Sequence, residues 1–266
     1  MENKEFSFGG LAAINYDKVL VPIIFRPWAS KLLDSLGSLE NLIVLDLATG
    51  TGIVAQLLEK KVGNNGKVIG ADINGEMLKI AKINVPFANF IECPADSINL
   101  EDKSVDYVVC QQGFQFFQTK FAAAKEINRI LKSGGKCAIT TWMPIDRCLF
   151  FGAVSSALNE VGEKALADKI CLPFDFMPKS KLIEVFNSSE FKDVQVSEQE
   201  MELKVENKIQ AIELAYATPI GSQLQELTEE KQEKFKKILL EKVNEFSESE
   251  NSLGPLATLI LTARKD

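Results

Sequence analysis

The feature that constrains this chain most is a glycine-rich turn between a predicted buried strand and a predicted helix. Residues 41–48 (NLIVLDLA) form a short apolar run, typical of a parallel strand that is buried on both faces. The turn TGTG (49–52) follows, and residues 53–61 then have the apolar spacing of a helix. Glycine lets a backbone turn tightly and approach a ligand closely. Together with Ala55, the turn has the spacing G-x-G-x-x-A, which favours a nucleotide-like ligand, although a tight strand–helix turn without a ligand would show the same glycines.

The rest of the first half continues to alternate between strand and helix signals. The sequence predicts further strands at 67–73, 89–93, 105–110 and 136–142, with helices from Asn74 to Pro86 and over 120–131. Ser133-Gly134-Gly135 is expected to end the second of these helices. This alternation predicts an α/β fold with a parallel sheet covered on both faces.

The pattern changes after Met143-Pro144. We expect helices over 150–161 and 179–188, a loop rich in Pro and Phe over 171–178, and a charged helical region over 208–247. An alternating segment covers 194–205, and a last strand is expected at 256–264. We therefore predict a single structural domain with N-terminal helices or a lid (1–40), an α/β core (41–142) and a remainder (143–266). That remainder completes the sheet and carries helical cap insertions at about 146–178 and 206–250.

Composition excludes several classes of function. The chain has no histidine, which removes Ser-His-Asp triads, Cys-His dyads and histidine metal sites. Its five cysteines include no C-x-x-C pair, so we predict neither a disulfide framework nor a metal site. The net charge of −7 argues against nucleic acid as a partner. We see no apolar run of membrane-spanning length and no signal peptide, so we expect a cytoplasmic protein without an integral membrane segment.

Two more acidic residues follow predicted strands. Asp72 ends the second strand, where a carboxylate can accept both ribose hydroxyls of an adenosine. Asp96 lies just past the third strand, where it can accept a hydrogen bond from an adenine amino group. Asp96 could equally be a helix cap or a turn residue. With Asp46, however, three carboxylates mark the carboxyl ends of successive strands, which is where open α/β sheets bind ligands.

In these segments the chain resembles class I S-adenosylmethionine-dependent methyltransferases. It is similar to the small-molecule methyltransferases that include the ubiquinone/menaquinone-biosynthesis type. The matching segments are 15–33, VLDLATGTGIVA (44–55), VIGADINGEMLKIA (68–81), 91–117 and EINRILKSGGKCAITTW (126–142). The resemblance implies a Rossmann-like, doubly wound, seven-stranded sheet with an antiparallel last strand and a helical cap. It identifies the cofactor and the fold, and it leaves the acceptor open.

The resemblance also implies roles for individual residues. Asp46 and the backbone of Ala48, Gly50 and Gly52 would surround the methionine part of S-adenosyl-L-methionine. Asp72 would hold the ribose, and the adenine would lie among Ile73, Met77, Asp96 and Ser97. Gln111 would lie beside the methionine and the sulfonium, and Tyr16 would contact the cofactor carboxylate. Tyr16 could equally be a packed helix residue, since tyrosine is commonly half-buried.

The chain departs from the family pattern after the fourth strand. Many relatives carry a pair of histidines there, whereas this chain has Gln115 and Phe116. Glutamine cannot act as a general base, so we assign Gln112 and Gln115 to substrate positioning. An acceptor pocket rich in aromatic residues is expected from the N-terminal helices, this loop and the cap, with the candidates Phe6, Phe8, Tyr16, Phe25, Trp28, Gln112, Gln115, Phe116, Trp142, Met143, Phe150, Phe151, Phe174, Phe176 and Met177. Each single Phe is as well explained by ordinary packing.

The main interpretation is methyl transfer to a small, hydrophobic or aromatic molecule. Two alternatives stay open: an isomerisation or cyclisation on the same fold, and a NAD-dependent oxidoreductase. The second is disfavoured because it leaves Asp46 and Asp96 without a use. A non-enzymatic adapter would predict an eroded cofactor site, and this one keeps its acids and glycines. A homodimer is one assembly that the sequence leaves open, and the acceptor atom is not specified.

Overall fold

The computed structural model describes residues 9–175, 177–247 and 249–266. Internal packing divides the chain into two compact units, each built from three segments. We call them the helical unit (1–25, 142–176 and 199–258) and the sheet unit (26–141, 177–198 and 259–266). The cap insertions expected at 146–178 and 206–250 fall largely in the helical unit. That the whole chain acts as one structural domain stays a prediction.

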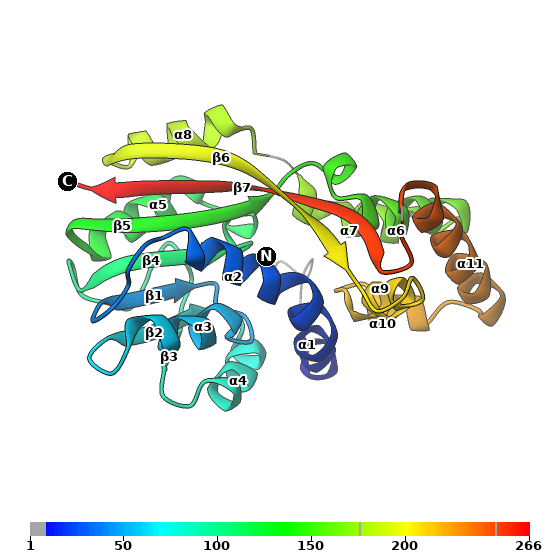
Figure 1. Ribbon diagram of the computed structural model, residues 1–266, viewed down its shortest axis with the longest axis horizontal. Helices are drawn as coiled ribbons and strands as arrows, with labels where there is room; N and C mark the ends of the chain where they lie inside the picture. Colours follow the sequence, from blue (N-terminus) through cyan, green and yellow to red (C-terminus); the bar gives the residue numbers. More distant parts are fainter. Residues whose placement is uncertain (1–8, 176, 248) are drawn as a thin grey trace. The chain divides into compact units, whose positions relative to one another are not determined.

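A seven-stranded sheet organises the chain, in the order β3-β2-β1-β4-β5-β7-β6. Figure 1 shows this order, and the last strand runs antiparallel to its neighbours, which confirms the predicted methyltransferase-like fold. The strands β1 to β5 are parallel to one another. Their bounds are β1 (Ile43–Leu47), β2 (Lys67–Asp72), β3 (Asn89–Glu92), β4 (Val105–Gln111), β5 (Leu131–Trp142), β6 (Phe191–Lys204) and β7 (Ser252–Lys265).

The strand order places the helices of the sheet unit in two layers. From β1 the chain moves through β2 to β3 in one direction, and from β4 to β5 in the other. Because parallel crossovers are right-handed, the helices of these two halves cover opposite faces. The helices α2 (Arg26–Asp34) and α3 (Ile53–Val62) pack together, as do α5 (Lys120–Ile130) and α8 (Lys179–Ser188), while α4 (Gly75–Asn84) lies against β3. This arrangement leaves the carboxyl ends of five strands at one edge.

The helix predicted over 120–131 matches α5 to within one residue, but the signal expected to end it is wrong. The helix α5 ends at Ile130, ahead of Ser133-Gly134-Gly135, and Leu131 is already extended. The cause is strand pairing, because Leu131 pairs with Val105 before the regular register of β4 and β5 resumes at Tyr107 and Lys136. Residues 132–135 therefore form an irregularity inside β5, with Gly134 at a φ of +75°.

The helical region expected at 208–247 is divided into several helices. The region 208–247 forms three helices, α9 (Gln210–Ala217), α10 (Gly221–Gln225) and α11 (Glu229–Phe246). Thr218-Pro219 follows α9 and Thr228 caps α11, and these residues explain both breaks. The loop predicted at 171–178 is also partly wrong, because α7 (Lys164–Cys171) and a short helical turn (Leu172–Phe174) occupy its first half. The other helices of this unit are α1 (Gly10–Asn15), a wider π-helical segment (Tyr16–Phe25) and α6 (Leu149–Glu160).

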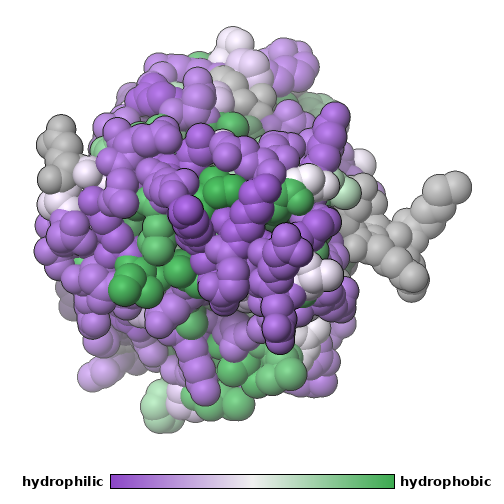
Figure 2. Space-filling model, turned by 90° about the vertical axis from the view of Figure 1, so that its right-hand side faces the viewer, coloured by the Kyte–Doolittle hydropathy of each residue, from purple (hydrophilic) through white to green (hydrophobic). Residues whose placement is uncertain are grey.

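None of the helices in the described parts of the chain combines the length and the apolar character needed to cross a bilayer. On the face drawn in Figure 2, hydrophilic side chains predominate and hydrophobic ones form separate patches between them. Exposed apolar side chains do occur, and Leu11 and Phe87 are among the most exposed.

Candidate functional site

The ends of neighbouring strands bring most of the predicted cofactor residues to one edge of the sheet unit. In the pairing registers, Asp46 of β1 lies between Gly70 and Val109, and Asp72 of β2 lies beside Glu92. Gln111 at the end of β4 pairs with Thr140 of β5. The backbone N–H of Thr49 donates to the carbonyl of Ala71, so the turn after β1 is tied to the end of β2.

The turn after β1 owes its shape to three residues with left-handed backbone angles. Ala48, Gly50 and Gly52 have φ values of +57°, +55° and +91°. A Cβ added to Gly52 would lie 3.1 Å from Val85 Cγ2 and 3.3 Å from Ala81 Cβ, so this glycine is needed where α3 approaches α4. A Cβ added to Gly50 would meet no atom within 4 Å. The open space of the turn therefore lies on the side of Gly50.

Asp46 is turned into the protein. Its side chain is almost fully buried, and Oδ2 accepts hydrogen bonds from Thr49 Oγ1 (2.5 Å) and from the N–H of Ala55 (3.0 Å). These bonds join the end of β1, the turn and the first helical turn of α3. Burial raises the pKa of this carboxyl to about 7, although the two hydrogen bonds act in the opposite direction. Asp46 thus holds the turn in place, a role for which the only sequence signal is a threonine three residues later.

Asp72 lies at the same edge and is tied to both of its neighbouring turns. Its Oδ2 accepts from the N–H of Gly50 (2.8 Å) and its Oδ1 from the N–H of Asn74 (2.9 Å). Burial raises the pKa of this carboxyl, and the backbone hydrogen bonds counteract that rise. Asn74 in turn caps α4 by accepting from the N–H groups of Glu76 and Met77. The carboxylate is therefore fixed in orientation, as a ribose-binding acid needs to be.

These residues fit an adenosine-containing cofactor. The side chain position of Gly50 is open, so the backbone of the turn can be approached closely. Ile73, directly after Asp72, is 71% exposed, and such an apolar side chain next to an acid suits the face of a nucleobase. Met77, by contrast, is buried in α4, so its predicted contact with the adenine stays a prediction.

Asp96 and Ser97 follow β3 and are both exposed. Asp96 Oδ2 accepts a hydrogen bond from the hydroxyl of Thr119, the residue before the first turn of α5. Asp96 is therefore already oriented by α5, and the adenine contact predicted for it and for Ser97 stays a prediction.

The glutamines after β4 lie in a tightly packed turn. Gln111 and Gln112 are buried, and Gln112 has a φ of +53°. Its N–H donates to Thr140, both to the carbonyl (3.2 Å) and to Oγ1 (3.0 Å). The next residue, Gly113, packs against the β1 turn, since a Cβ there would lie 2.4 Å from Ala48 Cβ. The sequence gives no signal for this role of Gly113, whose close approach joins the two turns. Gln115 is half-buried and Phe116 is 47% exposed.

The comparisons with known proteins agree with this geometry. A family model described as a methyltransferase domain matches residues 45–139. The demethylmenaquinone methyltransferase of Lactococcus lactis is 32% identical over 199 residues, which cover 68% of this chain and 79% of that protein. This chain belongs to the class I S-adenosylmethionine-dependent methyltransferases.

Other relatives of this methyltransferase match more locally. The ubiquinone/menaquinone biosynthesis C-methyltransferase of Xanthomonas oryzae is 37% identical over 102 residues, 36% of this chain. This chain covers only 40% of the length of that relative. Among solved structures, a phosphoethanolamine N-methyltransferase of Haemonchus contortus, in complex with S-adenosylhomocysteine, has a TM-score of 0.62 and 15% identity, and the match covers 97% of this chain and 58% of that one. A methyltransferase of Aquifex aeolicus has a TM-score of 0.54 and 21% identity, with 74% of this chain and 94% of that one covered. The two structures support the fold of the methyltransferase.

The acceptor candidates of the helical unit form a continuous aromatic cluster. Ring centroids of successive members lie 4.8–6.4 Å apart, from Tyr16 and Phe25 through Trp142 to the cap residues. The rings at the Tyr16 end are half-buried, and those at the cap end are buried. We use the name aromatic cluster for Tyr16, Phe25, Trp142, Phe150, Phe151 and Phe174. Phe6, Phe8 and Phe176 lie outside the described residues.

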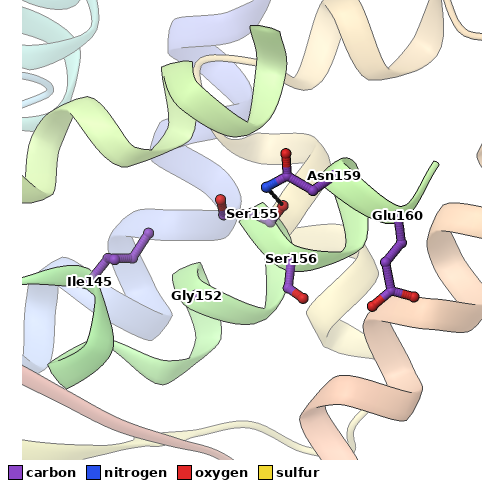
Figure 3. A pocket seen from close by; sticks show the side chains of 6 residues that line it. All are labelled: Ile145, Gly152, Ser155, Ser156, Asn159 and Glu160. Carbon is purple, nitrogen blue, oxygen red and sulfur yellow. Dashed lines mark hydrogen bonds between the residues drawn. The ribbon is translucent and has the colours of Figure 1, made fainter. Parts of the chain in front are cut away.

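One other candidate site, a cavity in the helical unit, offers less chemistry. The helical unit has a cavity of about 460 Å³ along α6, drawn in Figure 3. It shares no residue with the predicted sites, and two of its polar side chains are already engaged: Asn159 donates to the Ser155 carbonyl, and Glu160 pairs with Lys242. In the described parts of the chain, no group of three Cys, Asp or Glu side chains could hold a metal ion.

Proposed function

We propose that this methyltransferase transfers a methyl group from S-adenosylmethionine to a small, hydrophobic or aromatic acceptor. Binding of S-adenosylmethionine is supported by the open turn at Gly50, whose N–H donates a hydrogen bond to the oriented carboxylate of Asp72. The aromatic cluster supports the acceptor half of the proposal, because its half-buried rings at the Tyr16 end offer an apolar surface that a planar molecule can bind.

The residues at the ends of β1, β2 and β4 would bind the cofactor. Asp72 would hold the ribose, the turn of Ala48, Gly50 and Gly52 would lie along the methionine part, and Gln111 would lie beside it. Bound S-adenosylmethionine supplies a methyl group that is already activated on a sulfonium. Because the donor is activated, positioning and the exclusion of water are the main tasks left to the protein.

No histidine is present to remove a proton from the acceptor. The thiol of Cys110, at the end of β4, is unsuited to that task because burial raises its pKa. Gln112 and Gln115 would position the acceptor by hydrogen bonds, and the acceptor proton would leave to water or to a carboxylate. This arrangement suits acceptors that ionise readily, such as phenols and acids.

The proposal is tested first by calorimetric titration of the protein with S-adenosylmethionine and with S-adenosylhomocysteine. We expect micromolar binding of both, with at least a tenfold loss in Asp72→Ala, since a charge-assisted hydrogen bond contributes about 1.5–3 kcal/mol. Asp34→Ala, which removes an exposed carboxylate paired with Lys61 in the same unit, should bind as the wild type does. Folded protein that binds neither compound would refute the cofactor assignment.

The acceptor is then sought by incubating the protein and S-adenosylmethionine with hydrophobic phenols, amines and acids. Mass spectrometry should show a gain of one methyl group in the accepted compound and one equivalent of S-adenosylhomocysteine. An acceptor that is converted without a gain in mass would favour the non-methylating isomerisation or cyclisation.

A further inference from the structure

The loop between β3 and β4 (93–104) is fastened along the whole length of α5. At the start of the helix, the hydroxyl of Thr119 donates to Asp96. At its end, the N–H groups of Lys103 and Ser104 donate to the carbonyls of Arg129 (3.0 Å) and Ile130 (2.8 Å). We call this segment the adenine loop, because it carries the two residues, Asp96 and Ser97, that the family resemblance places at the adenine.

Between these two ends, the guanidinium of Arg129 holds the middle of the adenine loop. Two of its N–H groups donate to loop carbonyls, to Ile98 O (2.9 Å) and to Leu100 O (2.8 Å). A third donates to Asp102 Oδ1 (2.6 Å), and the other two form a fork on Glu126, at 2.9 and 2.7 Å. All five N–H donors of the guanidinium are engaged, which is as many as an arginine has.

Glu126 also contacts the adenine loop, as a hydrogen-bond acceptor. Its Oε1 accepts from the N–H of Ile98 at 2.8 Å, and its fork with Arg129 lowers the pKa of the carboxyl. The backbone N–H and C=O of Ile98 are therefore both bound by the pair on α5. Ile98 lies two residues after Asp96, and its side chain is buried. By fixing the backbone at Ile98, the Glu126–Arg129 pair helps to fix the position of the nearby Asp96 backbone.

A lysine could not replace this guanidinium. A lysine ammonium has three donors on one atom and cannot span two loop carbonyls and two carboxylates with a planar fork. The network thus depends on geometry as well as on charge. An ordinary surface ion pair contributes little to a fold, but this one fixes backbone atoms of a segment that has only loop structure of its own.

We propose that Arg129 is a positioning residue for nucleobase recognition: it holds the adenine loop so that Asp96 accepts from the adenine amino group. Arg129 thereby sets the preference of the site for adenine over a 6-oxopurine, which has no amino hydrogen at that position. The inference rests on the proposed function, since it requires that the site binds an adenosine cofactor.

The test compares two ligands, S-adenosylhomocysteine and its 6-oxopurine analogue S-inosylhomocysteine, by calorimetry. The wild type should bind the adenine form about tenfold more tightly. Arg129→Lys should reduce this preference to about twofold or less and leave the affinity for the inosine form nearly unchanged. The matched control is Arg264→Lys, which alters a guanidinium–carboxylate pair with Asp193 in the same unit. It should keep the full preference.

Two further variants separate positioning from general damage. Asp102→Ala removes one of the five bonds at a carboxylate that is 73% exposed, so it should fold normally and lose about half of the preference on a logarithmic scale. In an Asp96→Ala background, Arg129→Lys should have no further effect, because the acceptor through which it acts is already absent.

Several outcomes would overturn the inference. Equal weakening of both ligands in Arg129→Lys would mean a purely structural role, and an unchanged preference would mean no role at all. A wild type that binds both ligands equally would remove the adenine contact of Asp96 and the inference with it. A wild type that binds neither ligand would instead refute the proposed function.

Discussion

The two loops of the predicted cofactor site are held in place by different means. The turn after β1 combines left-handed φ values at Ala48, Gly50 and Gly52 and a close approach to α4 with hydrogen bonds to the buried carboxyl of Asp46. The adenine loop is fixed by side chains of α5, above all by Arg129. The comparison teaches that the first loop should be sensitive to added atoms, whereas the second should be sensitive to lost hydrogen bonds.

The largest effect is expected from adding an atom to the turn after β1. Gly52→Ala should lower the free energy of unfolding by roughly 2–5 kcal/mol, the sum of about 1–2 for the left-handed backbone and about 1–3 for overpacking against Val85 and Ala81. Gly50→Ala is the matched control, because its φ is also positive but no atom lies within 4 Å of the new Cβ. Gly50→Ala should lower the free energy of unfolding only by the backbone contribution of about 1–2 kcal/mol. Urea unfolding of the two variants checks this, and equal losses would mean that packing against α4 is not the constraint.

The second prediction concerns the buried carboxyl under the β1 turn. The folded pKa of Asp46 is raised to about 7 from 3.8, so between these values the folded state holds a proton that the unfolded state releases. Stability therefore falls as pH rises from about 4 to 7, by at most about 1.4 kcal/mol per pH unit from this group. Asp46→Asn cannot ionise and should flatten the curve of unfolding free energy against pH. Asp72, whose pKa is also raised, contributes a slope that remains in this variant.

The measurement is urea unfolding at pH 4.5, 5.5, 6.5 and 7.5. Asp34→Asn, at an exposed carboxylate, should follow the wild-type slope. A slope in Asp46→Asn equal to that of the wild type would mean that Asp46 is ionised throughout and that burial does not dominate its pKa.

The smallest expected effect lies at the adenine loop. Thr119→Val removes the hydroxyl that donates to Asp96 while keeping the shape of the side chain. Because both groups are exposed, stability should fall by only about 0.5 kcal/mol. The affinity for S-adenosylhomocysteine should fall about twofold to threefold, as measured by calorimetry. Thr119→Ser keeps the hydroxyl and should match the wild type. Since serine keeps this donor, a loss as large in the serine variant would mean that the hydroxyl bond to Asp96 is not the cause of the effect.

Much of the fold could be predicted because strand and helix signals agree with the strand order. The predicted strand at 41–48 contains β1, and the helix predicted over 179–188 has the bounds of α8. The cause that ends α5 could not be predicted, since glycines normally end a helix, whereas here Leu131 pairs with Val105 and starts β5 directly after Ile130. At this position, strand pairing with β4 outweighs the local preference of the glycines for ending a helix.

The candidate site was predictable as a set of positions but not as a set of contacts. The spacing places Asp46, Asp72 and Asp96 near the ends of neighbouring strands, and in the structure Asp46 lies next to the end of β1, Asp72 ends β2 and Asp96 follows β3. Their contacts with a cofactor stay a prediction. The sequence does not show that Asp46 turns inward to Thr49 and Ala55. Nor does it show that Glu126 and Arg129 reach the adenine loop, because two opposite charges three residues apart normally indicate a solvated helix face.

The position of β7 has a consequence for how the chain assembles. The strand β6 precedes β7 in the sequence, but β7 lies between β6 and β5 in the sheet. We therefore expect β6 to join the sheet only after β7 has paired with β5, because its neighbour in the sheet is β7 and not β5. In that interval the edges of β5 and β6 both expose unpaired backbone groups, which are templates for association between chains. The order of the strands thus makes this step slow and dependent on distant contacts, and it is there that misassembly would begin.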